Sequence, residues 1–243
     1  MESSSTFRGR RILVVGGTSG IGLAVAQAFH AAGGIVEVTG LTAEEVAHCR
    51  SQHPHLLVSQ LDVSQDADVM KLVGGLSALD VLVNCAGMIL RQGEEFDPVK
   101  FQRVVDVNLT GTMRMCAACR PLLAANRGAI MNIASMLSFF GSGYAPAYSS
   151  SKGGIAQLTK SLAIAWAKEG IRVNAVAPGW IETSLTQPLT ADPSRRQAIV
   201  DRTPLGRWGQ PDDVSGAVLF LCSAQAAFIT GAILPVDGGY SIM

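Results

Sequence analysis

The sequence predicts an α/β fold in which a doubly wound parallel sheet carries helices on both faces. Three observations lead to this prediction: seven short apolar runs, helical patterns that separate one run from the next, and a glycine-rich turn directly after the first run. Alternation of short strands with helices is typical of parallel sheets, because each crossover lays a helix over the sheet. We therefore expect a ligand cleft at the carboxyl ends of the strands.

The composition fits one domain spanning residues 1–243 and argues against several classes of partner. Hydrophobic residues make up 48% of the chain, enough for a large core, and no shift in composition marks a linker. Lysine plus arginine and aspartate plus glutamate number 19 each, so no charge excess favours nucleic acid or an anionic membrane. No apolar run reaches the roughly 18 residues of a membrane span. We expect a small-molecule partner, and neither nucleic acid nor a membrane.

Cysteine usage predicts a reducing, cytoplasmic location. The five cysteines form an odd set without the spacing of a disulfide framework, and the amino terminus M-E-S-S-S-T holds no apolar signal segment. Cys116-x-x-Cys119 has a spacing found in redox and zinc sites, but it lies in the Met, Ala and Leu-rich segment from Thr112 to Ala125, whose pattern is that of a buried helix. We interpret these cysteines as packed thiols and predict no metal site.

The first strand and the turn after it suit a diphosphate. Arg11 to Val15 is an apolar, β-branched run, and the turn G-G-T-S-G-I-G leads from it into the amphipathic segment from Leu23 to Ala32. Glycines let backbone N–H groups approach phosphate oxygens, and the start of a helix adds partial positive charge. The candidate binding residues in this turn are Gly16, Thr18, Ser19, Gly20, Ile21 and Gly22.

The second strand, Ile35 to Thr39, ends where dinucleotide-binding folds distinguish NAD from NADP. A carboxylate there binds the 2′-hydroxyl of the adenosine ribose, whereas a basic residue binds a 2′-phosphate. This chain has Gly40 and Leu41 at that position, and the capping box Thr42-x-x-Glu45 then opens a helix. The cofactor stays open between NAD and NADP, with a slight preference for NADP because no acid at the strand end would repel a phosphate.

Two further strand ends bring small or polar residues to the same edge of the sheet. The strand Leu56 to Leu61 and the strand Asp80 to Val83 precede these residues, and small side chains there let a flat ligand approach closely. The candidate binding residues are Asp62, Val63, Asn84, Ala86 and Gly87. The helical patterns that separate the strands are Asp66–Leu76, Pro98–Asn108 and the segment with the two cysteines.

Ser135, Tyr148 and Lys152 form the candidate catalytic set. Tyr148 and Lys152 lie four residues apart at the start of a predicted helix, so their side chains share one face. An ammonium at ~4 Å favours the phenolate by roughly 4 kcal/mol at an effective dielectric constant of ~20, which predicts a phenol pKa near neutrality. Ser135 follows the apolar strand Ala129 to Ala134, so its hydroxyl lies at a strand's carboxyl end. The set predicts general acid–base chemistry.

The remaining pattern completes the fold and adds a lid. Residues from Trp180 to Pro211 are rich in Pro, Thr and Arg and lack periodicity, which predicts a mobile substrate lid over about residues 180–211. The other predicted elements are a helix from Tyr148 to about Lys168, a strand at Arg172–Ala177 closed by Pro178 and Gly179, a helix at Val214–Leu221 and a strand at Ala232–Val236.

In this order and spacing the motifs resemble the short-chain dehydrogenase/reductase family, in its small single-domain form with a Rossmann-type fold. The resemblance covers nearly the whole chain. The matching motifs are G-x-x-x-G-I-G at 16–22, Asp62-Val63, N-C-A-G at 84–87, Asn108 in D-V-N-L, Ser135, Tyr148-x-x-x-Lys152, Pro178-Gly179 with Thr183, and V-D-G-G at 236–239.

The resemblance implies an NAD(P)-dependent enzyme that interconverts a secondary alcohol and a ketone by hydride transfer. It implies that Tyr148 is the general acid or base and that Ser135 holds the reacting oxygen. Lys152 would lower the pKa of Tyr148 and bind the nicotinamide ribose, while Asn108, at a helix interruption, would hold a proton-relaying water. Implied cofactor contacts are Asp62 and Val63 at the adenine, Asn84 at the ribose side, Ile181 and Thr183 at the carboxamide, and Pro178 and Gly179 beside them.

The predicted ring around the reacting carbonyl is mostly apolar. Its members are Met88, Ile89, Leu90, Met136, Leu137, Phe139, Phe140, Tyr144 and Trp180. They predict an apolar acyl, aromatic or alicyclic substrate. P-L-G-R-W-G-Q-P and F-I-T-G also resemble the 3-oxoacyl-carrier-protein reductases of fatty acid synthesis. Those enzymes grip the carrier with basic residues at two positions where this chain has Asn126 and Glu169, with Arg127 and Lys168 beside them. A sugar or polyol dehydrogenase is a further alternative.

Two expectations concern the protein as a whole. A non-catalytic nucleotide-binding protein that kept the fold would usually lack Ser135, Tyr148 or Lys152, and this chain has all three. The resemblance also implies a homotetramer built through the helices beside the active site and the last strand. The apolar, small-residue faces around Ala156–Ala167 and Ala217–Leu221 fit that expectation.

Overall fold

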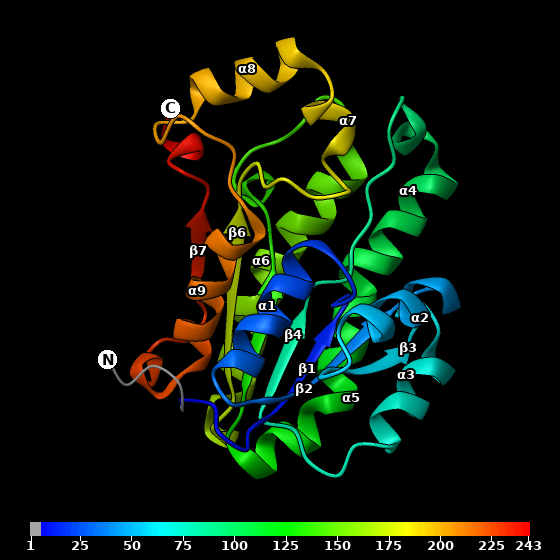
Figure 1. Cartoon of the computed structure of the whole chain (residues 1–243), viewed down its shortest axis with the longest axis vertical. Coiled ribbons are helices and arrows are strands. Elements are labelled where there is room, and N and C mark those ends of the chain that lie inside the picture. Colours follow the sequence, from blue (N-terminus) through cyan, green and yellow to red (C-terminus); the bar gives the residue numbers. More distant parts are fainter. Residues whose placement is uncertain (1–5) are drawn as a thin grey trace.

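A parallel sheet with helices on both faces forms the core of the structure (Figure 1). The structure is a computed structural model that describes residues 6–243. The seven strands lie in the order β3-β2-β1-β4-β5-β6-β7, and every neighbouring pair is parallel, which confirms the predicted fold class. They are β1 (Arg11–Val15), β2 (Ile35–Gly40), β3 (Leu57–Gln60), β4 (Val81–Asn84), β5 (Ala129–Ile133), β6 (Arg172–Pro178) and β7 (Ile233–Val236). The strand order reverses between β1 and β4, and such a switch point opens a ligand crevice.

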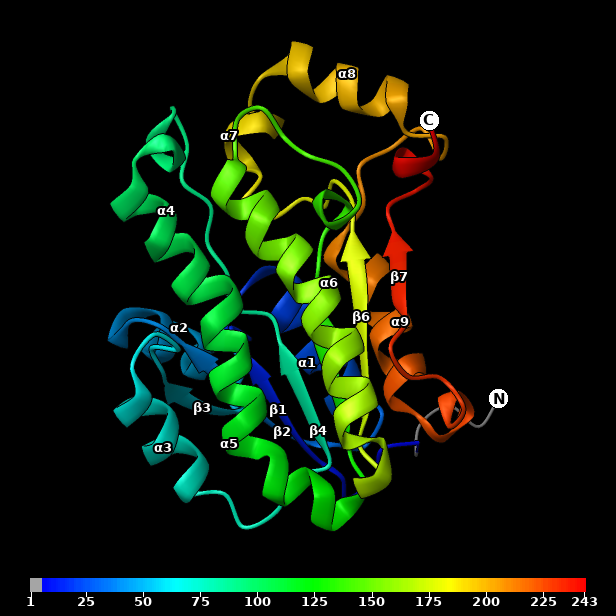
Figure 2. The ribbon, with the colours of Figure 1, turned by 180° about the vertical axis from the view of Figure 1, so that it is seen from behind.

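The helices divide between the two faces of the sheet, as the views from front and back show (Figures 1 and 2). Phe29 of α1 and Val218 of α9 pack on one face, whereas Met115 of α5 and Trp166 of α6 pack on the other. The helices are α1 (Gly20–Ala31), α2 (Ala43–Gln52), α3 (Asp66–Gly74), α4 (Pro98–Val105), α5 (Gly111–Asn126), α6 (Pro146–Trp166), α7 (Gln187–Thr190), α8 (Pro193–Arg202) and α9 (Pro211–Cys222). Within residues 6–243, no helix combines the length and apolar character needed to cross a bilayer.

Burial on both faces explains why the strand sequences are apolar without interruption. Leu13 and Val14 of β1 are neighbours in the sequence, yet Leu13 packs in the cluster under α5 and α6 and Val14 packs in the cluster under α1 and α9. Successive side chains of a strand point to opposite faces, so a strand covered on both sides needs apolar residues at every position.

The two cysteines of the C-x-x-C motif are packed thiols, as predicted. Cys116 and Cys119 on α5 are fully buried and free, within the cluster on the α5 and α6 side. Burial raises the pKa of Cys119 to about 12, because the thiolate would lose its hydration there. Among residues 6–243, no three His, Cys, Asp or Glu residues gather in a way that could hold a metal ion.

Two predicted segments differ from the structure. The predicted helix Pro98–Asn108 is α-helical only to Val105 and continues as a π-helical turn, Asp106–Thr110, into α5. The predicted irregular lid contains α7 and α8, which lie beyond the carboxyl ends of the strands (Figure 1). Asp192 caps α8 by accepting hydrogen bonds from two backbone N–H groups of its first turn. Both helices are short and have a proline in the first turn, so the sequence shows no clear helical periodicity over them.

Candidate active site

A cleft of about 410 Å³ opens at the carboxyl edge of the sheet, around β1 and β4. The glycine-rich turn after β1 forms one part of its wall. The rest comes from the ends of β2, β3, β4 and β5, from α2, α4 and the π-helical turn after it, from the first turns of α6, and from the start of the predicted lid. The predicted residues that the structure brings together on this wall are Gly16, Thr18, Ser19, Gly20, Ile21, Gly22, Gly40, Leu41, Asp62, Val63, Ala86, Gly87, Tyr148, Lys152 and Thr183.

Four predicted cofactor contacts do not lie on this wall: Asn84, Pro178, Gly179 and Ile181. The Asn84 side chain turns into the core, where its Nδ2 donates to Asn132 Oδ1 at 2.9 Å. It therefore joins β4 to β5 instead of facing the predicted ribose site. Ile181 is buried and pairs with Gly209 at the base of the lid.

The turn after β1 has the form that a diphosphate requires. Gly16 has a φ of +75°, and a Cβ there would lie 2.6 Å from the backbone nitrogen of Ala86, so only glycine fits against the end of β4. The turn leads into α1, whose N-cap residue Ser19 makes no side-chain capping hydrogen bond. The first turn of α1, which lies wholly in the described chain, holds no acidic residue. Backbone N–H groups at this helix start are thus available to the phosphates of a dinucleotide.

Tyr148 and Lys152 line the other end of the cleft, and Ser135 lies beside Tyr148 without lining the cleft. Ser135 follows β5, and its hydroxyl lies close enough to the phenol of Tyr148 to lower the pKa of that phenol. Lys152 lies one turn after Tyr148 on α6, and its Nζ is 5.6 Å from the centroid of the phenol ring. That Nζ donates to the carbonyl oxygen of Ile133 at 2.6 Å, so β5 holds the ammonium in place. The three side chains meet as the sequence predicted.

The pKa of Tyr148 in the folded chain differs from the value that the sequence predicts. Burial is the largest cause and raises the pKa of Tyr148 to about 12; the hydroxyl of Ser135 lowers this pKa, but by less than burial raises it. Burial also lowers the pKa of Lys152, to about 8. The predicted value near neutrality is therefore wrong for this state, because it counted the attraction between the two charges without the cost of removing both from water.

Asn108 lies in the π-helical turn, which confirms the expected helix interruption. Its Oδ1 accepts from the backbone nitrogen of Met88 at 2.8 Å, and its Nδ2 donates to the carbonyl oxygen of Met88 at 2.9 Å and to Ser151 Oγ at 3.0 Å. A Cβ on Gly87 would lie 3.4 Å from Asn108 Oδ1 and 3.8 Å from Lys152 Nζ. The extra residue of the π turn aims this side chain at the loop after β4, beside Lys152.

Glu95 is a buried carboxylate that the sequence did not single out. It is 1% exposed, and its Oε1 accepts from the backbone nitrogen of Leu90 at 3.0 Å. Its Oε2 accepts from the backbone nitrogen of Tyr148 at 3.0 Å. Glu95 therefore ties the loop after β4 to the first turn of α6, and its charge raises the pKa of Tyr148. In the sequence it is the second of two adjacent glutamates, and no local pattern distinguishes the buried one from the exposed one.

Arg91 is a second charged residue that the sequence did not single out. Its Nη2 donates to the carbonyl oxygen of Leu185 at 2.6 Å, which joins the loop after β4 to the start of the lid. Leu185 lines the cleft. The positive charge of Arg91 lowers the pKa of Tyr148, so the guanidinium acts on the phenol through space.

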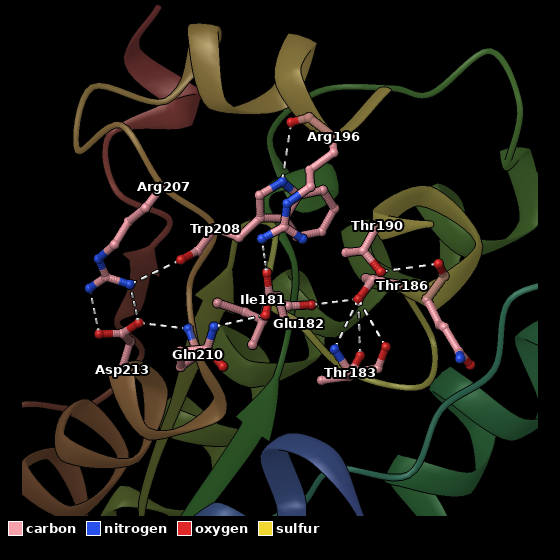
Figure 3. A network of polar contacts seen from close by, with 11 residues as sticks. Ile181, Glu182, Thr183, Thr186, Thr190, Arg196, Arg207, Trp208, Gln210 and Asp213 are labelled. Carbon is pink, nitrogen blue, oxygen red and sulfur yellow. Dashed lines mark hydrogen bonds and ion pairs between the residues drawn. The ribbon is translucent and has the colours of Figure 1, made fainter. Parts of the chain in front are cut away.

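The two ends of the predicted lid, residues 180–211, are joined by side-chain contacts of Glu182 with Arg196 and Gln210 (Figure 3) and by backbone hydrogen bonds. The backbone nitrogen of Gly209 donates to Trp180 O at 2.9 Å, and that of Glu182 donates to Gly209 O at 2.9 Å. The Glu182 carboxylate binds Arg196 of α8 and accepts from Gln210 Nε2 at 3.0 Å. These contacts fix the two ends of the lid, between which Ser184 and Leu185 reach the cleft wall.

The predicted apolar ring is only partly a wall of the cleft. Met88 lines it, whereas Tyr144 is 88% exposed and Phe139 is more than half exposed. Trp180 packs away from the cleft wall with Trp208, at 5.7 Å between ring centroids, and with Tyr240, at 6.1 Å. Of the predicted ring, Met88 therefore contributes to the cleft wall, and Arg91 adds a positive charge next to Leu185 of that wall.

The sheet order, the glycine turn at the switch point and the cleft define a Rossmann-type dinucleotide-binding protein. The sequence profile of the family described as enoyl-(acyl carrier protein) reductase matches residues 15–241. 2-Dehydro-3-deoxy-D-gluconate 5-dehydrogenase from Bacillus subtilis (strain 168) is 39% identical, with 99% of this chain and 98% of that protein covered. Cis-4-hydroxycyclohexanecarboxylate dehydrogenase from Sinomonas cyclohexanicum is 39% identical, with 97% and 98% covered.

A solved structure also matches nearly the whole chain. The crystal structure of a gluconate 5-dehydrogenase from Burkholderia cenocepacia J2315, in complex with NADP and tartrate, matches with a TM-score of 0.91 at 32% identity, covering 99% of this chain and 98% of that one. The chain belongs to the short-chain dehydrogenase/reductase family. It is an NAD(P)-dependent oxidoreductase.

Proposed function

We propose that this enzyme interconverts a secondary alcohol and a ketone on a small hydroxy acid, and that its substrate is a sugar acid. The substrates named for the two relatives, 2-dehydro-3-deoxy-D-gluconate and cis-4-hydroxycyclohexanecarboxylate, differ in their carbon skeletons but are both carboxylates. A shared carboxylate predicts a cation near the reacting carbon. The observation that carries the proposal is that Arg91 is bonded to Leu185 of the cleft wall and that its positive charge lowers the pKa of Tyr148.

Arg91 suits a substrate carboxylate in charge and in hydrogen-bonding capacity. Its guanidinium has five N–H donors in a planar fork. Its Nη2 donates to the carbonyl oxygen of Leu185, and the guanidinium makes no other hydrogen bond with residues 6–243. Because its charge acts on Tyr148, a substrate held between the two groups would place its hydroxyl at the phenol and its carboxylate at the guanidinium.

The proposed proton chemistry uses the residues at the same end of the cleft. In the oxidation direction Tyr148 accepts the hydroxyl proton while the hydride leaves the carbinol carbon; reduction reverses both transfers. Nicotinamide, when bound, accepts or supplies that hydride. Ser135 hydrogen-bonds the reacting oxygen, and Lys152 and Asn108 exchange the proton with solvent beside Gly87.

An alicyclic hydroxy acid is the second candidate, because Met88 lines the cleft and a relative acts on a cyclohexane ring. This candidate keeps part of the predicted alicyclic substrate and adds the carboxylate. The carrier-protein alternative has less support: Glu169, at a position where those reductases use a basic residue, receives a hydrogen bond from Arg120 Nε at 2.9 Å. An ion pair there does not form a basic docking surface.

Steady-state kinetics with matched substrates test the proposal. Gluconate, cis-4-hydroxycyclohexanecarboxylate and the neutral analogue cyclohexanol are compared with the wild type and with Arg91→Met. Loss of a charge-assisted contact costs about 1.5–3 kcal/mol, so kcat/KM for the preferred acid should fall about 10- to 100-fold. The loss for cyclohexanol should be clearly smaller, because only the rise in the pKa of Tyr148 affects a neutral alcohol. Equal losses on acid and neutral alcohol, or wild-type activity on the neutral alcohol alone, would contradict it. The acid with the higher kcat/KM separates the two candidates.

We also propose that the enzyme is a homotetramer. Ile164 on α6 and Leu234 on the edge strand β7 are exposed apolar side chains on the two surfaces that the family resemblance implies. Sedimentation velocity should give a mass four times that of the 25.4 kDa chain. A monomer at micromolar concentration would contradict the proposal.

A further inference from the structure

Ser138 joins the loop that carries Ser135 to the helix that carries Tyr148 and Lys152. It ends a 3-10 turn, Met136–Ser138, that directly follows Ser135. Its Oγ donates to the carbonyl oxygen of Lys152 at 2.6 Å and accepts from the backbone nitrogen of Ser135 at 3.3 Å. This one partly buried hydroxyl therefore contacts the backbone of two members of the candidate catalytic set.

The other hydrogen bonds of the turn hold Ser135 only to its own loop. The backbone nitrogen of Ser138 donates to Ser135 O at 2.8 Å, and that of Leu137 donates to Ser135 Oγ at 3.1 Å. Both bonds join residues no more than three positions apart, so they would move together with the loop. Among the hydrogen bonds that residues 135–138 make to backbone atoms of the described chain, the one from Ser138 to Lys152 reaches α6.

The end of β5 and the turn after it bind Lys152 at two places. Lys152 Nζ donates to the carbonyl oxygen of Ile133, the last residue of β5, and Lys152 O accepts from Ser138. Lys152 is 4% exposed and Ser135 is 7% exposed, so these contacts lie where little water can compete for them. Hydrogen bonds in such surroundings are stronger than in water. The two contacts therefore fix the loop of Ser135 against α6.

The same contacts set the direction of the Ser135 hydroxyl. A serine hydroxyl has one hydrogen to donate and two lone pairs that accept. The backbone nitrogen of Leu137 uses one lone pair, which leaves the hydrogen for a further oxygen. Because this hydroxyl lies close enough to the phenol of Tyr148 to lower its pKa, that further oxygen is one at or beside the phenol. A shift of the loop would turn the hydrogen away from it.

We propose that Ser138 is a positioning residue: its hydroxyl holds the loop of Ser135 on α6, so that Ser135 and Tyr148 reach the same substrate oxygen. Ser138 acts through Ser135 and not on the substrate itself. The inference rests on the roles that the proposed function gives to Ser135 and Tyr148, but not on the class of substrate.

Ser138→Ala tests the proposal, with Ser149→Ala as the matched control. Ser149 Oγ also donates to a backbone carbonyl, that of Ala145 at 2.8 Å, but this bond lies at the start of α6 and does not reach the loop of Ser135. The alcohol is whichever of gluconate, cis-4-hydroxycyclohexanecarboxylate and cyclohexanol the wild type oxidises fastest. Ser138→Ala should lower kcat about 10- to 100-fold, because a displacement of about 1 Å in a reacting group is enough for such a loss. The dissociation constants for NADH and NADPH should stay within about twofold, and Ser149→Ala should change neither quantity by more than about twofold.

The pH profile separates positioning from a general loss of structure. The Ser135 hydroxyl lowers the pKa of Tyr148, so a displaced hydroxyl lets this pKa rise. The rising limb of kcat/KM for alcohol oxidation should therefore move to higher pH in Ser138→Ala and stay in place in Ser149→Ala. Both variants keep the other titratable or charged groups around the phenol, which are Cys85, Arg91, Glu95 and Lys152.

Two kinetic outcomes would overturn the proposal: a Ser138→Ala enzyme with the kcat and pH profile of the wild type, or a control that loses as much as Ser138→Ala does. Crystal structures of the wild type and Ser138→Ala test it without any substrate. The distance from Ser135 Oγ to the phenol oxygen of Tyr148 should grow by about 1 Å in the variant, and an unchanged distance would also overturn the proposal. The preference of the wild type for acids over cyclohexanol decides the substrate class separately, so either proposal can fail without the other.

Discussion

The two ends of the cleft are built in different ways. The diphosphate end is built around backbone packed closely against glycines: Gly16 leaves room for Ala86, and Gly40 leaves room for Thr18. The catalytic end consists of buried polar side chains, such as Lys152 and Glu95, each fixed by a hydrogen bond to the backbone of another element. We therefore expect substitutions at the first end to change cofactor affinity and those at the second end to change rate and pH dependence.

The largest expected effect separates these two properties. Tyr148→Phe removes the proposed proton donor while keeping the ring, so kcat should fall at least about 10³-fold. The dissociation constant for the cofactor should stay within about twofold, because the diphosphate end is unchanged. Stopped-flow turnover and nucleotide fluorescence measure the two quantities on one preparation. Equal losses of affinity and rate would show that the two ends are not separable.

Gly16→Ala should have the opposite effect and weaken cofactor binding. A Cβ 2.6 Å from the backbone nitrogen of Ala86, at a φ of +75°, forces the turn away from β4. We expect cofactor affinity to fall about tenfold or more and the free energy of unfolding to fall by about 1–3 kcal/mol. Gly74→Ala, at the end of α3 where a Cβ would meet no atom within 4 Å, is the control and should be neutral or slightly stabilising in urea unfolding.

Glu95→Gln should shift a pH profile. The charge of Glu95 raises the pKa of Tyr148, so its removal lowers that pKa. Alcohol oxidation needs the phenolate, and the rising limb of kcat/KM should therefore move to lower pH. The neighbouring Glu94→Gln removes an exposed carboxylate that pairs with Lys100 and should leave the profile in place. A profile unchanged in Glu95→Gln, or one that moves to higher pH, would contradict an electrostatic role for Glu95.

The smallest expected effect lies at the base of the lid. Arg207 donates to both carboxylate oxygens of Asp213, at 2.7 and 2.8 Å, and the pKa of Asp213 falls to about 2. Because this folded-state pKa lies below the ordinary value of 3.8, the ion pair stabilises the fold above about pH 4 and its contribution is lost as the pH falls through 2. Both side chains are partly exposed, so Arg207→Ala should cost less than about 1 kcal/mol at pH 7, as urea unfolding would measure.

The strands could be predicted closely because their burial is visible in the sequence. β1 has the predicted bounds, and each end of the other six strands lies within one residue of its predicted position. The agreement is close because strands covered on both faces must be apolar throughout. The π-helical turn at Asp106–Thr110 could not be predicted, because D-V-N-L-T continues the helical pattern on either side. What distinguishes it is the Asn108 side chain held by Met88, a contact between distant segments.

The functional site also has parts that could be predicted from the sequence and parts that could not. The glycine turn and the spacing of Tyr148 and Lys152 are local patterns, and the structure brings these residues to one cleft. The pKa of Tyr148 could not be predicted from the sequence, because its largest cause is burial, which depends on the whole fold. Glu45 and Glu95 were missed for a related reason: each looks like an ordinary acid near a helix start, and only the folded chain shows that Glu45 lines the cleft and that Glu95 is buried.

The most direct test of the central claim is a crystal structure of Tyr148→Phe with cofactor and the preferred hydroxy acid. We expect the reacting oxygen to lie within hydrogen-bonding distance of Ser135 Oγ and the carboxylate to lie on the guanidinium of Arg91. A substrate bound with its carboxylate away from Arg91, or with its hydroxyl carbon far from Ser135, would contradict it.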